Sequence, residues 1–529
     1  MFYYPFYMNP LRKVSFILLA FLISFNSSAE SVDSLVRWNE LHFAGTFEQT
    51  SFTNFLKNST KDYLKLFLAN SPTGENDFTL FETKISKTLE EINSSGALRK
   101  KNDKKVKHIY QVVHEKFLSK YEEENRFYEI IKTGNYNCVT ATALYALFFE
   151  KLNIPYAIKE EPTHVYLVAY PNAENVLIET TTPMSGFLTF DNEYKARYID
   201  LLKKQKVIGS NEATPSNVDA LFNKYYFGKE NITLTQLIGI HFLNDALFKH
   251  DHDDIEGAYE QVKKGYLYYP NTRSEYLLMS FTAEKLESVS DPLQKAALIG
   301  QASRFKNAGI TSEMIQGEFH NLTQTVLLKN NDKDLYLKCY RETQRNIHDP
   351  ELAKEIDYIF YYENGRVFYN QGNYVRAKPY FAKALQTQPN NVDLGGIFVS
   401  CLAQSLRNER NNVVILDSLE SYKTRFPALL QNNNFNSMIA YAYVVEFGDS
   451  FKKGNVTRGE KYQQLFEKLY ESDKTLLSPD AVGNAYSEAS IYYFKKGQKV
   501  KAKELLEKGL EIVPDNYQLK ARRQMINGG

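Results

Sequence analysis

The chain has 529 residues, more than one ordinary hydrophobic core accommodates, so we expect two to four domains. Hydrophobic residues make up 43% and charged residues 24%, which is the composition of a folded globular protein and excludes wholesale disorder. The 64 lysines and arginines nearly balance the 63 aspartates and glutamates. This balance argues against a nucleic-acid-binding protein and against a general attraction to anionic membranes.

The first residues have the pattern of a secretory signal peptide. Arg12 and Lys13 precede an apolar run over 14–25, and small residues follow at 27–29. The run is shorter than the roughly 20 apolar residues that a membrane span needs, although an uncleaved anchor is the alternative. We expect a signal peptide over 1–29, export to the periplasm or cell envelope, and no stable membrane span after cleavage.

Apolar residues at helical spacing follow this segment. Leu35, Trp38 and Leu41 recur at steps of three, and the same kind of pattern continues with interruptions toward residue 127. We interpret residues 30–104 as a helical lead. A longer amphipathic helix is then expected from Val106 to Phe117.

The stretch Gly134-Asn135-Tyr136-Asn137-Cys138 predicts a tight loop that ends at a helix start. Residues 139–149 are apolar nearly all round, so the helix expected from Val139 to about Lys151 must be buried on most faces. Two short β-rich runs follow, one opening on His164 and one carrying Glu179, with a hairpin expected over 171–175. The two side chains share a face of the hairpin only if paired residue numbers have an odd sum, or if a bulge corrects the register.

A cysteine at a helix start, then a histidine, then a carboxylate is the order of a thiol-nucleophile triad. The helix start supplies free N–H groups and a positive dipole end, which favour the thiolate form of Cys138. His164 would pair with this thiolate and protonate a leaving amine, and Glu179 would orient the imidazole. The same N–H groups could receive an oxyanion, with Asn135, Asn137 or Tyr136 as candidate side-chain donors.

The number of cysteines also favours a functional cysteine over a set of stabilising disulfides. The chain has three cysteines, Cys138, Cys339 and Cys401, an odd number that leaves at least one thiol free. The acidic and histidine-rich segment 250–254 could suggest a metal site. It falls where a turn between two helices is expected, so we interpret its residues as the polar, solvent-exposed residues of that turn. We therefore predict no metal and no organic cofactor.

The C-terminal part shows internal repetition. Gly372, Ala377, Phe381, Ala384 and Pro389 have the same spacings as a second set over 497–514 and as a weaker set over 253–270. This pattern predicts helical hairpins, because a turn residue separates two helices, small residues allow close approach, and proline ends the second helix. Preceded by Gly365 and Phe368, the first set resembles the tetratricopeptide repeat. We expect a connecting segment over 191–230 and a helical repeat solenoid over 231–529.

At the cysteine, histidine and glutamate positions the chain resembles the transglutaminase-like superfamily, whose core has a papain-like arrangement. The resemblance covers about residues 105–190 and rests on the segment before Cys138, on His164-Val165-Tyr166 and on Glu179-Thr180-Thr181. It implies that Cys138 is the nucleophile, His164 the base and Glu179 the third member. The sequence departs from the family pattern in having glutamate where aspartate is usual.

Together these features predict a mostly α, multidomain protein with a small α+β transglutaminase-like core and a C-terminal α–α solenoid. The expected function is an exported cysteine-dependent acyl-transfer enzyme, a cysteine peptidase or amidase that hydrolyses peptide or amide bonds. The repeats would recruit protein or peptide partners. The alternative is a non-catalytic cell-envelope scaffold that binds proteins through these repeats.

Overall fold

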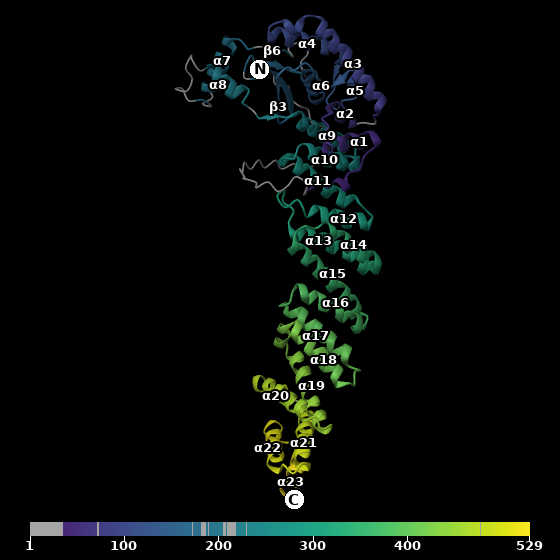
Figure 1. Cartoon of the computed structure of the whole chain (residues 1–529), viewed down its shortest axis with the longest axis vertical. Helices are drawn as coiled ribbons and strands as arrows, with labels where there is room; N and C mark the ends of the chain where they lie inside the picture. Colours follow the sequence, from purple (N-terminus) through teal and green to yellow (C-terminus); the bar gives the residue numbers. More distant parts are fainter. Residues whose placement is uncertain are drawn as a thin grey trace, which may run out of the picture. The chain divides into compact units, whose positions relative to one another are not determined.

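The computed structural model describes residues 35–70, 73–171, 173–180, 187–188, 190–204, 208, 218–228, 230–476 and 478–528. Helices make up most of these residues and strands only a small part (Figure 1), which confirms the predicted mostly α class. The expected signal peptide lies outside the described residues. Within the described residues, no helix is long and apolar enough to cross a membrane.

The chain divides into two compact units, residues 1–274 and residues 275–529. This boundary lies later than residue 231, where the sequence pattern placed the start of the repeats. Helices α9 (Leu234–Asp251) and α10 (Ile255–Tyr268) therefore belong to the first unit. They form a close hairpin, because a Cβ on Gly239 would lie 2.9 Å from the Gly265 carbonyl oxygen.

The first unit begins with a series of helices and two short strands. These helices confirm the helical character expected for this region. The helix expected from Val106 to Phe117 begins four residues earlier, at Asn102. The elements are η2 (Trp38–Glu40), α1 (Thr46–Leu56), α2 (Tyr63–Ala69), α3 (Glu75–Ser94), η3 (Ala97–Arg99), α4 (Asn102–Phe117), β1 (Lys120–Tyr121), α5 (Glu129–Lys132), β2 (Asn135–Tyr136) and α6 (Cys138–Lys151).

A five-stranded antiparallel sheet follows α6, with strand order β6-β5-β4-β3-β7. The strands are β3 (Tyr156–Glu161), β4 (His164–Ala169), β5 (Val176–Ile178), β6 (Phe187–Leu188) and β7 (Asn231–Ile232). Only β4 and β5 were expected from the sequence. Strand β3 pairs with β4 through a two-residue turn that places Glu161 opposite His164.

The two faces of this sheet pack against different helices. Val165, Leu167 and Ala169 of β4 belong to the core that contains α6, whereas Tyr166 and Val168 belong to a second core. That second core is closed by α7 (Asn192–Lys204) and α8 (Val218–Tyr226), which lie on the side of the strands away from α6 (Figure 1). The segment expected only to connect two domains therefore covers one face of the sheet.

The second unit consists of successive helices that pack mostly on their chain neighbours. Helix α11 (Thr272–Ser288) starts just before the unit boundary. The remaining helices are α12 (Pro292–Ala302), α13 (Ser312–Thr323), η4 (Gln324–Lys329), α14 (Lys333–Asn346), α15 (Pro350–Asn370), α16 (Tyr374–Thr387), α17 (Val392–Leu406), α18 (Asn412–Arg425), η5 (Pro427–Gln431), α19 (Asn433–Lys452), α20 (Val456–Ser472), α21 (Pro479–Lys495), α22 (Lys499–Ile512) and α23 (Tyr517–Gly528).

The strongest repeat signature forms the hairpin of α15 and α16. Gly372 turns the chain between them with φ +71°, a conformation that glycine adopts without a steric penalty. Gly365 faces the ring of Phe381, and a Cβ at this glycine would lie 2.8 Å from two ring carbons. Helices α19 and α20 form a similar hairpin that the sequence pattern missed, because Gly459 occupies the position of the small alanine.

Candidate functional site

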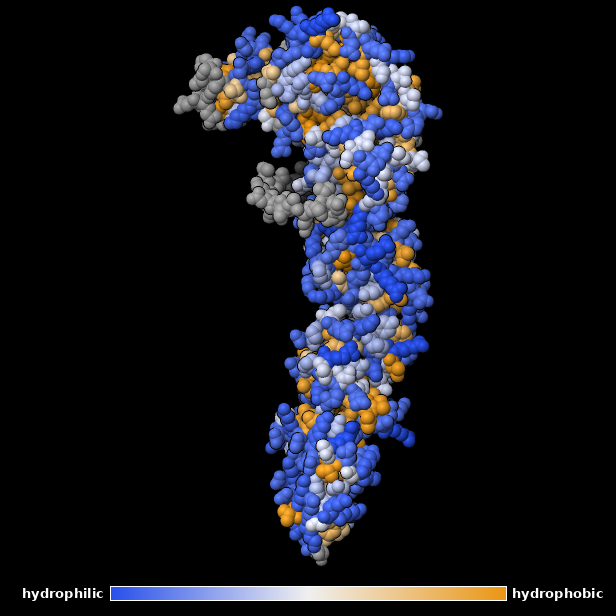
Figure 2. Space-filling model, viewed as in Figure 1, coloured by the Kyte–Doolittle hydropathy of each residue, from blue (hydrophilic) through white to orange (hydrophobic). Residues whose placement is uncertain are grey.

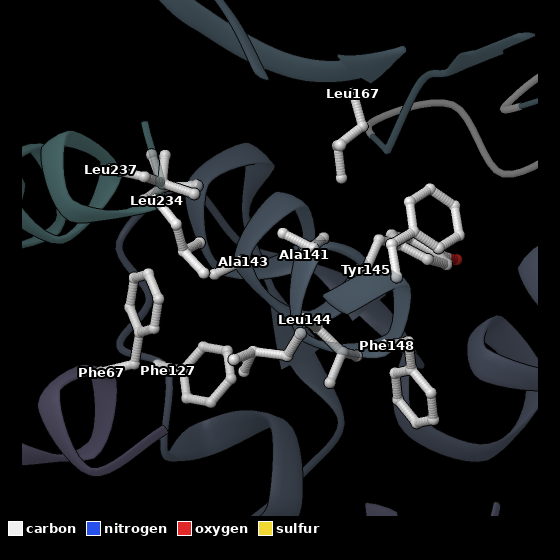
Figure 3. Close-up of a cluster of buried hydrophobic side chains, with 14 of the residues drawn as sticks. Phe67, Phe127, Ala141, Ala143, Leu144, Tyr145, Phe148, Leu167, Leu234 and Leu237 are labelled. Atoms are coloured by element: carbon white, nitrogen blue, oxygen red, sulfur yellow. The ribbon is translucent and has the colours of Figure 1, made fainter. Parts of the chain in front are cut away.

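Helix α6 fixes the position of Cys138. Every residue from 139 to 149 is buried, as the apolar sequence of this stretch predicted. Figure 3 shows α6 enclosed, with Leu167 of β4, Leu234 and Leu237 of α9, and Phe67 and Phe127 of the preceding segments around it. Small residues such as Ala141 and Ala143 allow these neighbours to approach. A helix held on all sides gives its first residue a defined position.

The N-terminus of α6 is closed by Asn137. The side-chain oxygen of this residue accepts from the N–H of Thr140 at 2.9 Å, and the Thr140 hydroxyl accepts from the Asn137 N–H at 2.9 Å. The Asn137 amide nitrogen also donates to the carbonyl oxygens of Glu123 and Asn125, at 2.9 and 3.2 Å. This reciprocal capping stabilises the helix start that carries Cys138.

A short parallel pairing holds the chain that leads into the cap. Lys120 pairs with Asn135 and Tyr121 pairs with Tyr136. Gly134 precedes this pairing with φ +79°, and a Cβ there would lie 2.3 Å from the Ser119 hydroxyl oxygen. Glycine is therefore required at this position for two reasons, its backbone conformation and the lack of space.

The three residues expected to form a triad are brought together. His164 Nε2 lies 2.9 Å from Glu179 Oε2, and Cys138 is near enough to His164 to be the largest influence on its pKa. Because Nε2 is engaged by the carboxylate, Nδ1 is the ring nitrogen that remains for the thiol. Thr142, in the first turns of α6, donates to the carbonyl oxygen of Val165 at 3.3 Å and so holds the helix start beside the start of β4.

These contacts stabilise the charged form of the imidazole. The hydrogen bond with Cys138 raises the pKa of His164 most, the hydrogen bond with Glu179 adds to it, and burial opposes both, giving a pKa of about 10. An imidazolium at neutral pH between a thiol and a carboxylate is the arrangement that a thiolate–imidazolium pair requires.

The strand register explains how His164 and Glu179 meet. Leu167 pairs with Ile178 and Val168 pairs with Leu177, so paired residue numbers sum to 345. The sum is odd, as the shared face requires, but it is larger by two than the sum that would place the two residues directly opposite each other. Glu179 follows the end of β5, at the position opposite Tyr166, and reaches His164 diagonally.

The site around Cys138 is accessible to solvent, whereas the thiols of Cys339 and Cys401 are not. The side chains of His164 and Glu179 are 23% and 20% exposed, and Cys138 is half-buried. Cys339 and Cys401 are fully buried, and burial raises the pKa of each thiol to about 11. All three cysteines are free, so Cys138 is the thiol with both exposure and a basic partner.

The predicted side-chain donors for an oxyanion are engaged elsewhere. Asn137 uses its amide oxygen in the cap and its amide nitrogen on two carbonyls, and Asn135 donates to Glu122 at 2.7 Å. Tyr136 is 1% exposed and packs edge-on against Tyr121. The main-chain N–H groups at the start of α6 are therefore the better-placed donors, because the first N–H groups of a helix have no acceptor within it.

Two tyrosines to which the sequence analysis assigned no role lie near the site. Tyr166 lies two residues after His164 on β4, and the two rings stack with centroids 6.0 Å apart. Burial, and after it the charges of Cys138, Glu123 and Glu179, raise the pKa of Tyr121 to about 12. The pairing that places Tyr121 here spans two residues and leaves no periodic pattern from which it could have been predicted.

The segment 250–254 has structural roles. Asp254 caps α10 by accepting from the Gly257 N–H at 2.9 Å, and it lies 3.3 Å from the Lys249 amine. His252 lies 3.0 Å from a carboxylate oxygen of Glu124. In the part of the chain that the structure describes, no group of three or more histidine, cysteine or acidic residues is arranged to hold a metal ion.

No protein-family model and no curated protein sequence matches the chain. The interpretation of the site therefore depends on its geometry and on the order of its residues.

Proposed function

We propose that this protein is a cysteine-dependent acyl-transfer enzyme of transglutaminase-like type that hydrolyses peptide or amide bonds. The observation that carries the proposal is the chain of contacts from Cys138 through His164 to Glu179, at the start of a buried helix. The order of these residues and their placement on a helix and neighbouring strands support the resemblance to a papain-like core. A glutamate as third member suits the diagonal register, because its longer side chain spans the offset.

The chemistry follows from these positions. The Cys138 thiolate attacks the carbonyl carbon, and the oxyanion is received by main-chain N–H groups at the start of α6. The His164 imidazolium gives its proton to the leaving amine as the carbon–nitrogen bond breaks, which leaves a thioester. The neutral imidazole then takes a proton from water as the hydroxide attacks the thioester, a carboxylic acid leaves, and the Cys138 thiolate and His164 imidazolium are restored. Glu179 holds the ring and its charge throughout.

The remaining parts of the proposal concern location and partners. The N-terminal pattern supports export to the periplasm or cell envelope. The helical hairpins of the second unit, which resemble tetratricopeptide repeats, would recruit protein substrates or partners. Within this class of enzyme the proposal is hydrolysis rather than cross-linking.

The test is the reactivity of the thiol. We expect iodoacetamide at pH 7 to modify Cys138 rapidly and Cys339 and Cys401 only after unfolding, as measured by peptide mass spectrometry. In His164→Ala the alkylation rate of Cys138 should fall about tenfold or more, since the imidazolium no longer stabilises the thiolate. The buried thiols provide the internal control. Equal rates in wild type and variant would overturn the catalytic interpretation.

Turnover requires a second measurement. A mixture of quenched fluorescent peptides should be cleaved by the wild-type protein and not by Cys138→Ala, with Cys339→Ala as a matched thiol control. Cleavage that persists in Cys138→Ala would come from a contaminant. No cleavage, together with normal alkylation, would favour the second candidate function, a protein-binding scaffold, which the row of helical hairpins in the second unit supports independently.

A further inference from the structure

A groove in the second unit has the composition of a binding site. It lies on α14, α15 and α16, has a volume of about 440 Å³, and is open to solvent. Four aromatic residues and two cations line it, and the lining includes no carboxylate. The aromatic residues are Tyr340, Phe360, Tyr361 and Tyr380, and the cations are Arg341 and Lys383. On the face shown in Figure 2, hydrophobic residues of this unit form small patches in a mostly hydrophilic surface.

Ring stacking and a hydrogen bond hold the aromatic part of the groove in place. The rings of Tyr340 and Phe360 stack with centroids 3.9 Å apart and planes 15° apart, and Tyr361 lies edge-on to Tyr340 at 6.1 Å. The Tyr340 hydroxyl donates to a carboxylate oxygen of Asp357 at 2.6 Å. Burial and this carboxylate both raise the pKa of Tyr340, so the phenol stays neutral and keeps its hydrogen bond. A ligand would meet a surface that needs little ordering.

The two cations are not neutralised by the protein. Both side chains are exposed, and among the described residues neither Arg341 nor Lys383 has a carboxylate within ion-pair distance. The amine of Lys383 lies 4.9 Å from the ring centre of Tyr361. The carboxylate of Asp357, which lies beside Tyr340, already accepts from Tyr340 and from the Gln344 amide nitrogen at 2.5 Å. The groove therefore presents positive charge beside an aromatic wall.

From these observations we propose that the groove binds an acidic peptide segment of a partner protein that carries an aromatic side chain. The aromatic side chain packs on the wall formed by Tyr340, Phe360 and Tyr380. Its neighbouring carboxylates pair with Arg341 and Lys383, for which the groove itself provides no counter-charge. The proposal concerns the recruiting part of the molecule and does not depend on chemistry at Cys138.

The test uses the full chain and a fluorescein-labelled hexapeptide with one phenylalanine between two aspartates, followed by fluorescence anisotropy. We expect saturable binding, about tenfold weaker for Arg341→Glu and for Lys383→Glu. The matched control is Lys503→Glu, an exposed lysine of α22 with no ion pair among the described residues; its affinity should stay within about twofold of wild type. Replacing either both aspartates by asparagine or the phenylalanine by alanine should weaken binding about tenfold.

Three outcomes would overturn the proposal. The first is no binding of the hexapeptide at millimolar concentration, and the second is equal binding of the aspartate and asparagine peptides. The third is equal loss of affinity in Lys503→Glu and Lys383→Glu, which would indicate a general charge effect. Circular dichroism checks that each surface variant is folded. Cys138→Ala should bind the peptide like wild type, so failure here and failure of the proposed enzyme activity are distinguishable.

Discussion

The charge state of His164 gives the sharpest prediction about the site. Its pKa is about 10, against 6.5 for an ordinary histidine, and the hydrogen bond with Cys138 contributes more than the one with Glu179. One pKa unit corresponds to about 1.4 kcal/mol, so the surroundings of His164, with burial opposing the two partners, favour the imidazolium by a net of roughly 5 kcal/mol. At pH 8 a histidine of pKa about 10 is about 99% protonated, whereas an ordinary one is only about 3% protonated.

The test is to replace the two partners of His164, Cys138 and Glu179, one at a time and then together. We expect Cys138→Ala to lower the pKa of His164 more than Glu179→Gln does, and the double variant to bring it to or below the ordinary value, because burial alone lowers it. The assay is an NMR titration from pH 5 to about 11.5 with labelled histidine ring carbons, so that a midpoint near 10 is covered. The chain has nine histidines, so the His164 signal is assigned by its loss in His164→Gln.

A buried histidine provides the internal control. Burial lowers the pKa of His241 to about 3, so its signal should stay that of a neutral ring over the whole range. The reasoning is refuted if His164 of the wild-type protein titrates near pH 6.5, or if both single variants leave its midpoint unchanged. Either result would mean that the imidazole, thiol and carboxylate are not coupled in solution.

Three further predictions concern the scaffold and the stability of the site. Asn137→Asp keeps the cap acceptor but loses both amide N–H bonds at a buried position, so it should lower the free energy of unfolding by about 1–3 kcal/mol in chemical denaturation; an unchanged midpoint would contradict this role. Gly365→Ala should destabilise by about 1–3 kcal/mol because its Cβ meets Phe381. Gly396→Ala, a helical position with nothing within 4 Å, should instead stabilise by up to about 1 kcal/mol; the same sign for both would refute the packing argument. The free-energy difference between wild type and His164→Gln should stay constant from pH 5 to 6.5 and shrink as pH rises toward 10, because a raised folded-state pKa stabilises only while the group is protonated. A difference that grows with pH would contradict the assigned direction.

Much of the site could be predicted from the sequence because its local patterns are strong. The all-apolar stretch after Cys138 permits only a buried helix, and the alternating run after His164 permits only a half-buried or buried strand. The helical hairpin at Gly372 follows from glycine, alanine and aromatic residues at fixed spacing. Each of these patterns depends on neighbours within a few turns of the chain, so the sequence alone contains the necessary information.

Other features of the site depend on contacts between segments distant in the chain. The alternation of side chains along β4 and β5 fixes only whether the numbers of paired residues have an odd or an even sum. The loop between the two strands sets the actual sum, which is 345. The side chain of Asn137 was a possible oxyanion donor until the carbonyls of residues 123 and 125 came within its reach.

From the sequence alone Cys138, His164 and Glu179 could thus be predicted as a set, because helix and strand periods place them at or beside the ends of their elements. The tertiary structure decided how they meet, through the diagonal approach of Glu179, and which helices close the sheet. It also brought Arg341 and Lys383 from two different helices to one aromatic groove. The physical reason is that strand register and helix packing are set by side-chain fit between distant segments, and no local periodicity records that fit.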